Sequence, residues 1–215
     1  MYQIHPSEEL VELFSKTPYQ GVAPRDAEFL FIGLDANYAP NIAEQAIFPE
    51  ILEYHADAVG YWRRHGVHHP FLRPTYKGDG LKYHRNFAKV GFGPEDAGRV
   101  SFVELMHLPT VGRSKLHKDD LDLSHLQFIR DAMFDGRCKN VFLPNTVLMM
   151  MRRFKDLFPE LRVEIPRDDG LQLIHRDAIV SIYKHLHFSN YGKFEERLRR
   201  EAAEIKQLAT DIVDS

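Results

Sequence analysis

Runs of apolar residues along the chain predict several buried strands. Residues 28–34 are almost continuously apolar over the length of one strand, which is typical of a parallel strand that helices cover on both faces. Shorter runs predict further strands, strongly at residues 100–106, 140–144 and 178–183 and more weakly at residues 161–165 and 171–174.

Helical patterns occupy most of the segments between these strands. Ser7 is a suitable N-cap for a first helix, which should end near Lys16 because Pro18 disfavours helix at the residue before it. Further helices are predicted over residues 42–58, 82–90, 121–134, 146–158 and 193–212. Strands that alternate with helices indicate a single α/β domain over residues 1–215, a three-layer α/β/α sandwich with a short, mostly parallel central sheet.

The composition fits a soluble globular protein, with 44% hydrophobic and 27% charged residues. Cys138 is the single cysteine, so internal disulfides and four-cysteine metal sites are excluded. The first residues lack the features of a signal peptide and no apolar run has the length of a membrane span. We therefore expect a cytoplasmic protein, nucleoid-associated if bacterial, with no membrane partner. The net charge of −3 argues against a general nucleic-acid coat but allows a local basic groove.

Candidate chemistry lies where the predicted strands end, because ligands of parallel α/β sheets bind beyond the carboxyl ends of the strands. Asp35 follows the first buried strand, where a carboxylate can act as a general base toward water or can simply cap a turn or helix. Strand alternation places His185 and His187 on one face. Such histidines can ligate zinc with a third ligand, stabilise an anionic leaving group, or pack without a function.

Two loops combine basic residues with other polar or aromatic ones. The first has cations interleaved with Trp62, Phe71, Tyr76 and Tyr83, a combination that suits an unpaired base and its backbone. The same pattern also fits a surface loop whose aromatic rings fold onto the core. The second loop contains Arg113 and Lys115 and allows the same two interpretations.

Five segments, taken in order, resemble the uracil-DNA glycosylase superfamily and, within it, the mismatch-specific uracil/thymine glycosylase branch. Gly33-Leu34-Asp35 ends a segment similar to the first motif of the family, Gly-x-Asp or Gly-x-Asn. The other segments are residues 83–92, residues 103–110 ending in Pro109-Thr110, residues 140–144, and residues 182–191, in which His187-Phe188-Ser189 resembles the second motif, His-Pro-Ser.

The resemblance implies a monofunctional DNA glycosylase that needs no cofactor or metal and that acts on a base flipped out of duplex or single-stranded DNA. Asp35 then positions the attacking water, and His187, with His185 as the alternative, stabilises the departing base. Gly33, Leu34 and Asn37 fall in the base pocket, and Tyr38, Phe71 and Tyr76 are candidates for stacking on the base. The residues expected to contact DNA are Ser189, Asn190, Tyr191, Arg113 and Lys115. Ser189 would bind a backbone phosphate, and Tyr191 lies where the family inserts an apolar wedge into the duplex. A monomer is favoured.

Departures from the family pattern point to a different base. Ala36 and Asn37 replace a proline and a glycine of the first motif, and Phe188 and Asn190 replace two prolines of the second. Glu104 falls where the uracil branch has an asparagine, and an ionised glutamate only accepts hydrogen bonds. This favours a base other than uracil that presents an amino or N–H donor. Residues 54–80 resemble an insertion relative to the family.

Two further functions fit the same sequence. One keeps the fold without catalysis, as a module that binds nucleic acid or nucleotides. The other is a metal-dependent hydrolase that uses His185 and His187 together with one further histidine from His65, His68, His69 and His84.

Overall fold

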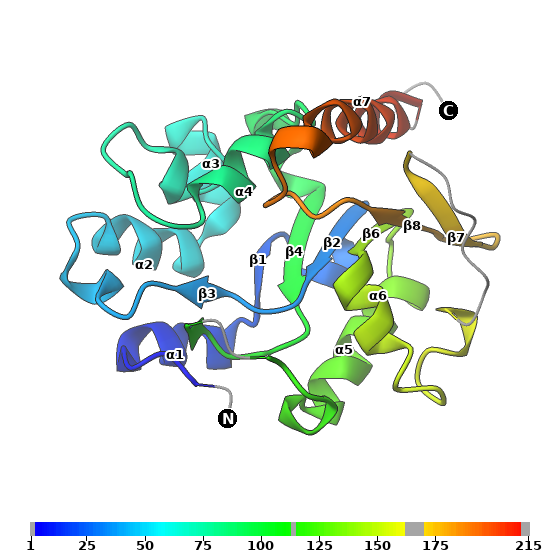
Figure 1. The fold of residues 1–215 in the computed structure, drawn as a ribbon, viewed down its shortest axis with the longest axis horizontal. Helices are drawn as coiled ribbons and strands as arrows, with labels where there is room; N and C mark the ends of the chain where they lie inside the picture. The colour runs from blue at the N-terminus through cyan, green and yellow to red at the C-terminus, as the bar shows by residue number, and fades with distance from the viewer. Residues whose placement is uncertain (1–2, 113–114, 162–169, 212–215) are drawn as a thin grey trace.

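A six-stranded, mostly parallel sheet forms the centre of the protein (Figure 1). The computed structural model describes residues 3–112, 115–161 and 170–211. The strands lie in the order β1-β4-β2-β6-β8-β7, in which the inner four are parallel and the two edge strands are antiparallel to their neighbours. Their bounds are β1 Tyr19–Gly21, β2 Phe29–Gly33, β4 Val100–Glu104, β6 Asn140–Pro144, β7 Gln172–Arg176 and β8 Ser181–His185.

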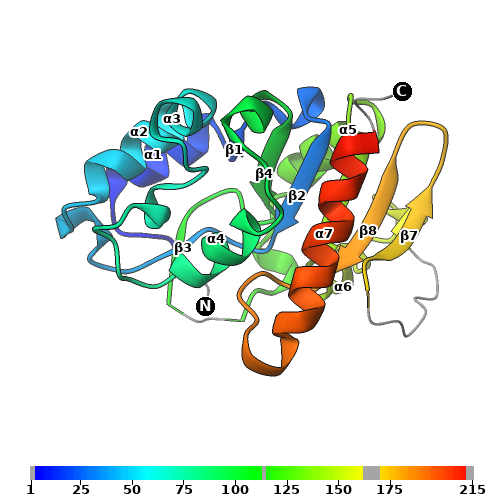
Figure 2. The ribbon, with the colours of Figure 1, turned by 90° about the horizontal axis from the view of Figure 1, so that it is seen from above.

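Helices cover both faces of the sheet, which confirms the predicted three-layer sandwich. One face is aromatic and packs against α3 (Ala58–His65), α4 (Leu81–Ala88) and α7 (Glu195–Asp211). The other face is aliphatic and packs against α5 (Leu123–Phe134) and α6 (Asn145–Met151). Figure 2 shows α7 in front of the sheet, on the aromatic side. Among the described residues, no helix combines the length and the apolar character needed to cross a bilayer.

A further group of elements lies beyond the β1 edge, at the opposite end of the molecule from β7 (Figure 1). It consists of α1 (Glu8–Lys16), α2 (Phe48–Ala56) and a two-stranded sheet of β3 (Asn37–Tyr38) and β5 (Thr110–Val111). Ser7 caps α1 as predicted, since its hydroxyl accepts a hydrogen bond from the backbone N–H of Leu10 at 3.3 Å. Buried residues of α1, α2 and β3 share one apolar cluster, which fixes this group beside the main sheet.

The strong strand predictions and the helices at residues 82–90, 121–134 and 193–212 are confirmed with small shifts. The helix predicted over residues 42–58 divides into a 3-10 turn (Ile42–Glu44) and α2, and α3 begins directly afterwards because Asp57 accepts a hydrogen bond from Gly60 N at 2.8 Å. The helix predicted over residues 146–158 ends at Met151, and the turns that follow bury Phe154 and Phe158 instead.

Other differences concern short or edge elements. The last parallel strand begins at Ser181 rather than at residue 178, because the Asp177 carboxylate accepts hydrogen bonds from the N–H groups of Ile179 and Val180 and closes a turn there. The weak strand at residues 171–174 is present as β7 but runs antiparallel to β8. Of the strand predicted at residues 161–165, Leu161 ends a 3-10 turn and the rest lies outside the described residues.

Phe31 tests the packing of the aromatic face. It is 2% exposed and stacks on Phe142 with ring centroids 4.7 Å apart. We expect Phe31→Ala to lower the free energy of unfolding by about 3–5 kcal/mol, because truncation leaves a cavity in a closely packed layer. Urea unfolding followed by circular dichroism measures the effect. Leu173→Ala, at a site that is 44% exposed on the edge strand, is the control. A loss as small as that of the control would contradict this packing.

Candidate active site

The register of the strands aligns side chains in rows across the aromatic face. Residues paired across neighbouring strands point to the same side of a sheet. Gln20, Phe102, Phe31 and Phe142 therefore form one row. Two residues further along their strands, Glu104 lies opposite Gly33, and His185 lies opposite Pro144. A pocket of about 400 Å³ opens over this second row, at the carboxyl ends of the parallel strands.

The pocket brings together most of the site residues predicted from sequence. Ten of them line it: Gly33, Leu34, Asp35, Asn37, Tyr38, Phe71, Glu104, His185, His187 and Ser189. Tyr76 does not, because its ring stacks on Phe71 at 4.1 Å and its hydroxyl donates to the Asp79 carbonyl oxygen. Asn190, Tyr191 and Lys115 are not part of the lining, and Arg113 lies outside the described residues.

Side-chain donors orient Asp35 at the end of β2. The Thr110 hydroxyl donates to Asp35 Oδ2 at 2.7 Å, and the Asn37 amide lies 3.5 Å from the same oxygen. Asn37 also donates to the Gly112 carbonyl oxygen at 2.6 Å, which joins the start of β3 to the residue after β5. Both hydrogen bonds that the described residues give this carboxylate come from side chains, so Asp35 does not act as a turn or helix cap there. Oδ1 remains available to a molecule in the pocket.

Glu104 occupies the space that Gly33 leaves open. A Cβ at Gly33 would overlap the Glu104 carboxyl group, so the glycine of the first motif has a steric role here. Burial, and secondarily the neighbouring Asp35 carboxylate, raise the pKa of Glu104 to about 8. Glu104 is therefore mostly a carboxylic acid at neutral pH, and it donates as well as accepts. This corrects the sequence-based assumption of an ionised, accept-only glutamate.

Hydrogen bonds distinguish the two histidines that follow β8. The backbone N–H of Ser189 donates to His187 Nδ1 at 3.1 Å, so the proton of the neutral ring must lie on Nε2. His185 has the opposite tautomer, because its Nδ1 lies 2.8 Å from the Leu186 carbonyl oxygen and must donate to it. Burial lowers the pKa of His185 to about 3, and burial also lowers the pKa of His187, although the Asp35 charge opposes that change. At neutral pH His187 thus has a ring N–H at Nε2, whereas His185 has an acceptor there.

The loop that holds His187 and Ser189 is fixed by two buried side chains. Asn86 of α4 donates through Nδ2 to the carbonyl oxygens of Phe188 at 2.6 Å and Asn190 at 3.1 Å. Glu201 of α7, which is 2% exposed, accepts a hydrogen bond from Leu186 N at 2.6 Å. These contacts constrain the loop around Phe188 and Asn190.

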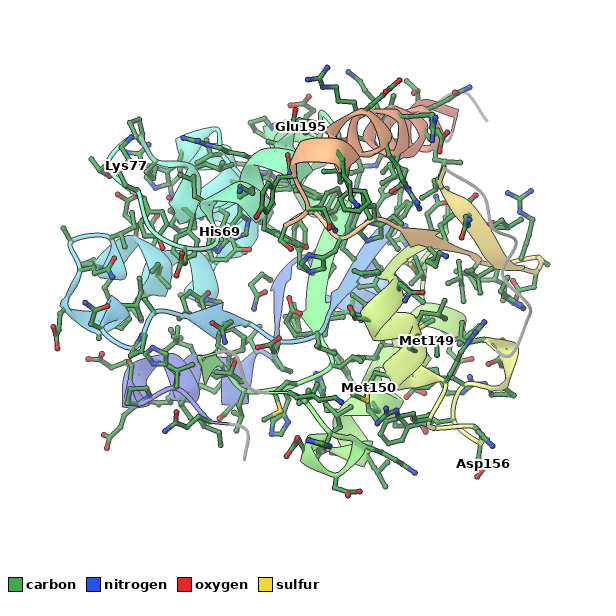
Figure 3. The ribbon with its side chains drawn as sticks, viewed as in Figure 1. His69, Lys77, Met149, Met150, Asp156 and Glu195 are labelled. Atoms are coloured by element: carbon green, nitrogen blue, oxygen red, sulfur yellow. The ribbon has the colours of Figure 1, made fainter. Side chains whose placement is uncertain are left out.

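The loop at residues 66–80, which contains Phe71 and Tyr76, folds inward and buries both rings, as expected if its aromatic residues pack onto the core. His69 lies on its inner side and Lys77 at its outer end (Figure 3). His69 stacks on His84 at 3.6 Å, and His68 Nε2 lies 3.1 Å from His84 Nδ1. Burial lowers the pKa of all three rings, which are neutral. In the part of the chain that the structure describes, no group of three or more histidine, cysteine or acidic side chains is arranged to hold a metal ion.

The outer side of the pocket offers polar and aromatic groups to a larger ligand. Ser189 is exposed and lines the pocket, while Tyr191 is 66% exposed. The Lys82 ammonium group lies 3.7 Å from the centroid of the Tyr191 ring, which joins the start of α4 to the loop after β8. Lys115 is exposed.

Sequence reasoning missed residues that complete the site. Thr110, which orients Asp35, was part of a quoted motif without an assigned role, and Asn86 is a buried polar residue that helix periodicity alone does not distinguish. Gln20 and Tyr54 are among the pocket-lining residues to which the sequence assigned no role. Their positions depend on contacts between distant segments, so no local signal marks them. No protein-family model matches this chain and no curated protein matches it, so the functional argument rests on the geometry of the pocket.

Asn86→Ala tests the constraint on the loop. The substitution leaves two buried carbonyl oxygens without a donor, and we expect a loss of about 1–3 kcal/mol in the free energy of unfolding. Hydrogen exchange should also accelerate at the amides of residues 187–191. Asn86→Asp cannot donate and should behave similarly, whereas Asn41→Ala at an exposed position should change neither quantity. Unchanged exchange in Asn86→Ala would show that the loop is held by other contacts.

Glu104→Gln tests the protonation of the buried acid. The folded pKa is near 8 against an ordinary value of 4.5, so the folded state keeps a proton that the unfolded state loses. This contribution to the free energy of unfolding is complete below pH 4.5. It decreases by about 3 kcal/mol as the pH rises toward 8. We expect Glu104→Gln to flatten this decline in urea unfolding between pH 5 and 8. Glu44→Gln, at an exposed site, should retain the wild-type slope, and a wild-type slope in Glu104→Gln would refute the assignment.

Proposed function

We propose that this protein is a monofunctional DNA glycosylase, a hydrolase that breaks the N-glycosidic bond of a damaged or modified base flipped out of DNA. The observation that carries the proposal is that Asp35 and His187 line one pocket, with the charge of Asp35 acting on the His187 ring. Breaking a glycosidic bond leaves a cationic sugar and an anionic base. A carboxylate and an N–H donor address these two charges.

Asp35 is suited to the water side of the reaction. Thr110 and Asn37 hold Oδ2, which leaves Oδ1 for a water molecule that would attack the sugar carbon. As the C–N bond breaks, its electron pair goes to the base nitrogen, and the carboxylate stabilises the positive charge on the sugar. The water oxygen then bonds to the sugar carbon, and its proton passes through Asp35 to solvent. The products are an abasic sugar and, once protonated, the free base.

His187 is suited to the leaving-group side. Its ring is neutral and presents Nε2–H, while Ser189 occupies Nδ1. A neutral imidazole can donate a hydrogen bond to a developing anion without adding a full charge to the free pocket. His185 has an unprotonated Nε2, and its lone pair would repel the negative charge of a departing base. This difference in tautomer favours His187 over His185 for the role, in agreement with the alignment of His187 with the second motif of the uracil-DNA glycosylase superfamily.

The pocket itself is suited to a flat heterocycle. Phe71 lines it and is supported from behind by the parallel ring of Tyr76, so Phe71 is the strongest of the three stacking candidates. Tyr38 also lines the pocket, but its hydroxyl is bound to His55 Nε2 at 2.7 Å. At the mouth of the pocket, the Ser189 hydroxyl donates to His187 Nδ1 at 2.6 Å and would have to turn away from it to bind a backbone phosphate. Tyr191 with Lys82 offers a ring and a cation to the strand next to the flipped base.

The same arrangement disfavours the metal-dependent alternative. His187 Nδ1 accepts a hydrogen bond, so its Nε2 carries the proton and is not a free ligand atom. The buried histidines of the long loop, His68 and His69, contact His84 of α4. The described residues thus offer no three-ligand group around which a hydrolytic metal would sit. A non-catalytic binding module remains the competing function and is separated by experiment.

Base release from oligonucleotides tests the proposal. Duplex and single-stranded oligonucleotides, each with one modified base, are incubated with the protein, and abasic sites are detected by alkaline strand cleavage. We expect Asp35→Asn and His187→Ala each to lower the rate by about 100-fold or more, with and without chelator, while DNA binding measured by fluorescence anisotropy persists. Asp119→Asn, at an exposed site that is not part of the pocket lining, is the matched control. Binding without release by the wild type would select the binding module instead.

A further inference from the structure

The pocket continues inward beyond the groups that the proposed hydrolysis uses. Its lining also includes Gln20, Tyr54, His68, His69, His84 and Phe102. Most of the buried rings are hydrogen-bonded or stacked on one another, but the Gln20 amide is not. Gln20 is 8% exposed, and its buried Nε2 has no hydrogen-bond partner among the described residues. A buried amide without a partner costs free energy, so its place on a cavity wall indicates a ligand that would bind it.

Gln20 lies one row deeper than Glu104. It pairs with Phe102, and Phe102 precedes Glu104 by two residues on the same strand, a separation of about 7 Å along the strand. A purine whose glycosidic nitrogen lies between Asp35 and His187 would place its second, six-membered ring, which carries the lactam edge, between Glu104 and the amide of Gln20. A single-ring base in the same position would reach Glu104 but not Gln20. The depth of the pocket therefore favours a bicyclic base over a single ring.

Glu104 indicates the chemistry of the base edge. Its carboxyl group lies against Gly33 and is faced by Asp35 after β2, Tyr38 of β3, Tyr54 of α2 and Tyr83 of α4. A second negative charge beside Asp35 is unfavourable, and the phenols supply no positive charge to compensate. As an acid, Glu104 presents an O–H donor next to a carbonyl acceptor. That pair is complementary to a ring N–H next to a carbonyl group, the lactam edge of an oxidised or deaminated base.

We propose that the base taken by this pocket is a purine with a lactam edge, of which deaminated adenine is the simplest, bound along that edge by the Glu104 carboxyl group and at its inner end by the Gln20 amide. This inference rests on the glycosylase function proposed above. Guanine shares the lactam edge, but it pairs firmly with cytosine, whereas a deaminated purine pairs weakly and is flipped at lower cost.

Four oligonucleotides separate ring size from edge chemistry. Each contains one target base at the same position: hypoxanthine (two rings, lactam), adenine (two rings, no lactam), uracil (one ring, lactam) or cytosine (one ring, no lactam N–H). We expect hypoxanthine to be released at least tenfold faster than uracil, and adenine and cytosine not to be released. Equal release of adenine and hypoxanthine would overturn the assignment of the edge.

Substitutions in the two reading residues sharpen the test. Gln20→Leu should slow hypoxanthine release by about tenfold, the cost of one lost hydrogen bond, and leave uracil release within twofold. Gln20→Met provides a second apolar replacement if the leucine is poorly folded, and the exposed Gln127→Leu is the control. Glu104→Gln keeps a donor and an acceptor and should retain hypoxanthine release while losing the decline above pH 8 expected of the wild type. Glu104→Met should abolish release of both lactam bases.

The outcomes distinguish this inference from the function on which it rests. Faster release of uracil than of hypoxanthine, with no effect of Gln20→Leu, would overturn the purine assignment and leave the glycosylase function standing. Release of no base by the folded wild-type protein, from these oligonucleotides or from the wider set of modified bases, would overturn the glycosylase function and this inference together.

Discussion

The site depends on one electrostatic constraint, the presence of two carboxyl groups at the ends of neighbouring parallel strands. Gly33 leaves the space in which the Glu104 carboxyl group lies beside Asp35. Two negative charges this close in a partly buried pocket are unfavourable, so burial and the Asp35 charge together keep the proton on Glu104. Asp35 accepts hydrogen bonds from Thr110 and Asn37. The pocket thereby obtains an acid and a base from two similar side chains, an arrangement that suits hydrolysis and base recognition at neutral pH.

The two faces of the sheet pack differently, and this difference determines on which face the carboxyl groups of Asp35 and Glu104 form a site. Alternation along β2 sends Phe29 and Phe31 to one side and Leu30 and Ile32 to the other. The aliphatic side closes tightly against α5 and α6. The aromatic side extends past the strand ends into the rings of α4 and of the loop at residues 66–80. The walls of the pocket thus combine a continuation of the aromatic core with polar side chains at the strand ends.

The sequence predicts the parallel strands, because each is a continuous apolar run. It predicts Asp35 and the segment from His185, because strand ends converge in this class of fold, whereas Glu104 and the choice of His187 come only from the family resemblance. It does not predict the inner wall. The three-residue strand that contains Gln20 has no pattern of its own and is defined only by pairing with β4, about 80 positions later. Nor does it predict protonation. The tautomers of His185 and His187 follow from single backbone hydrogen bonds, and the acid form of Glu104 follows from burial.

The loop after β8 is held mainly by side chains from outside it. Asn86 reaches its backbone from α4, Glu201 reaches it from α7, and within the loop the Asn190 side chain donates to the His187 carbonyl oxygen at 2.8 Å. Its conformation thus depends on contacts between distant segments. Such a loop is rigid only while α4 and α7 are in place, so the geometry of His187 depends on the packing of the whole aromatic face.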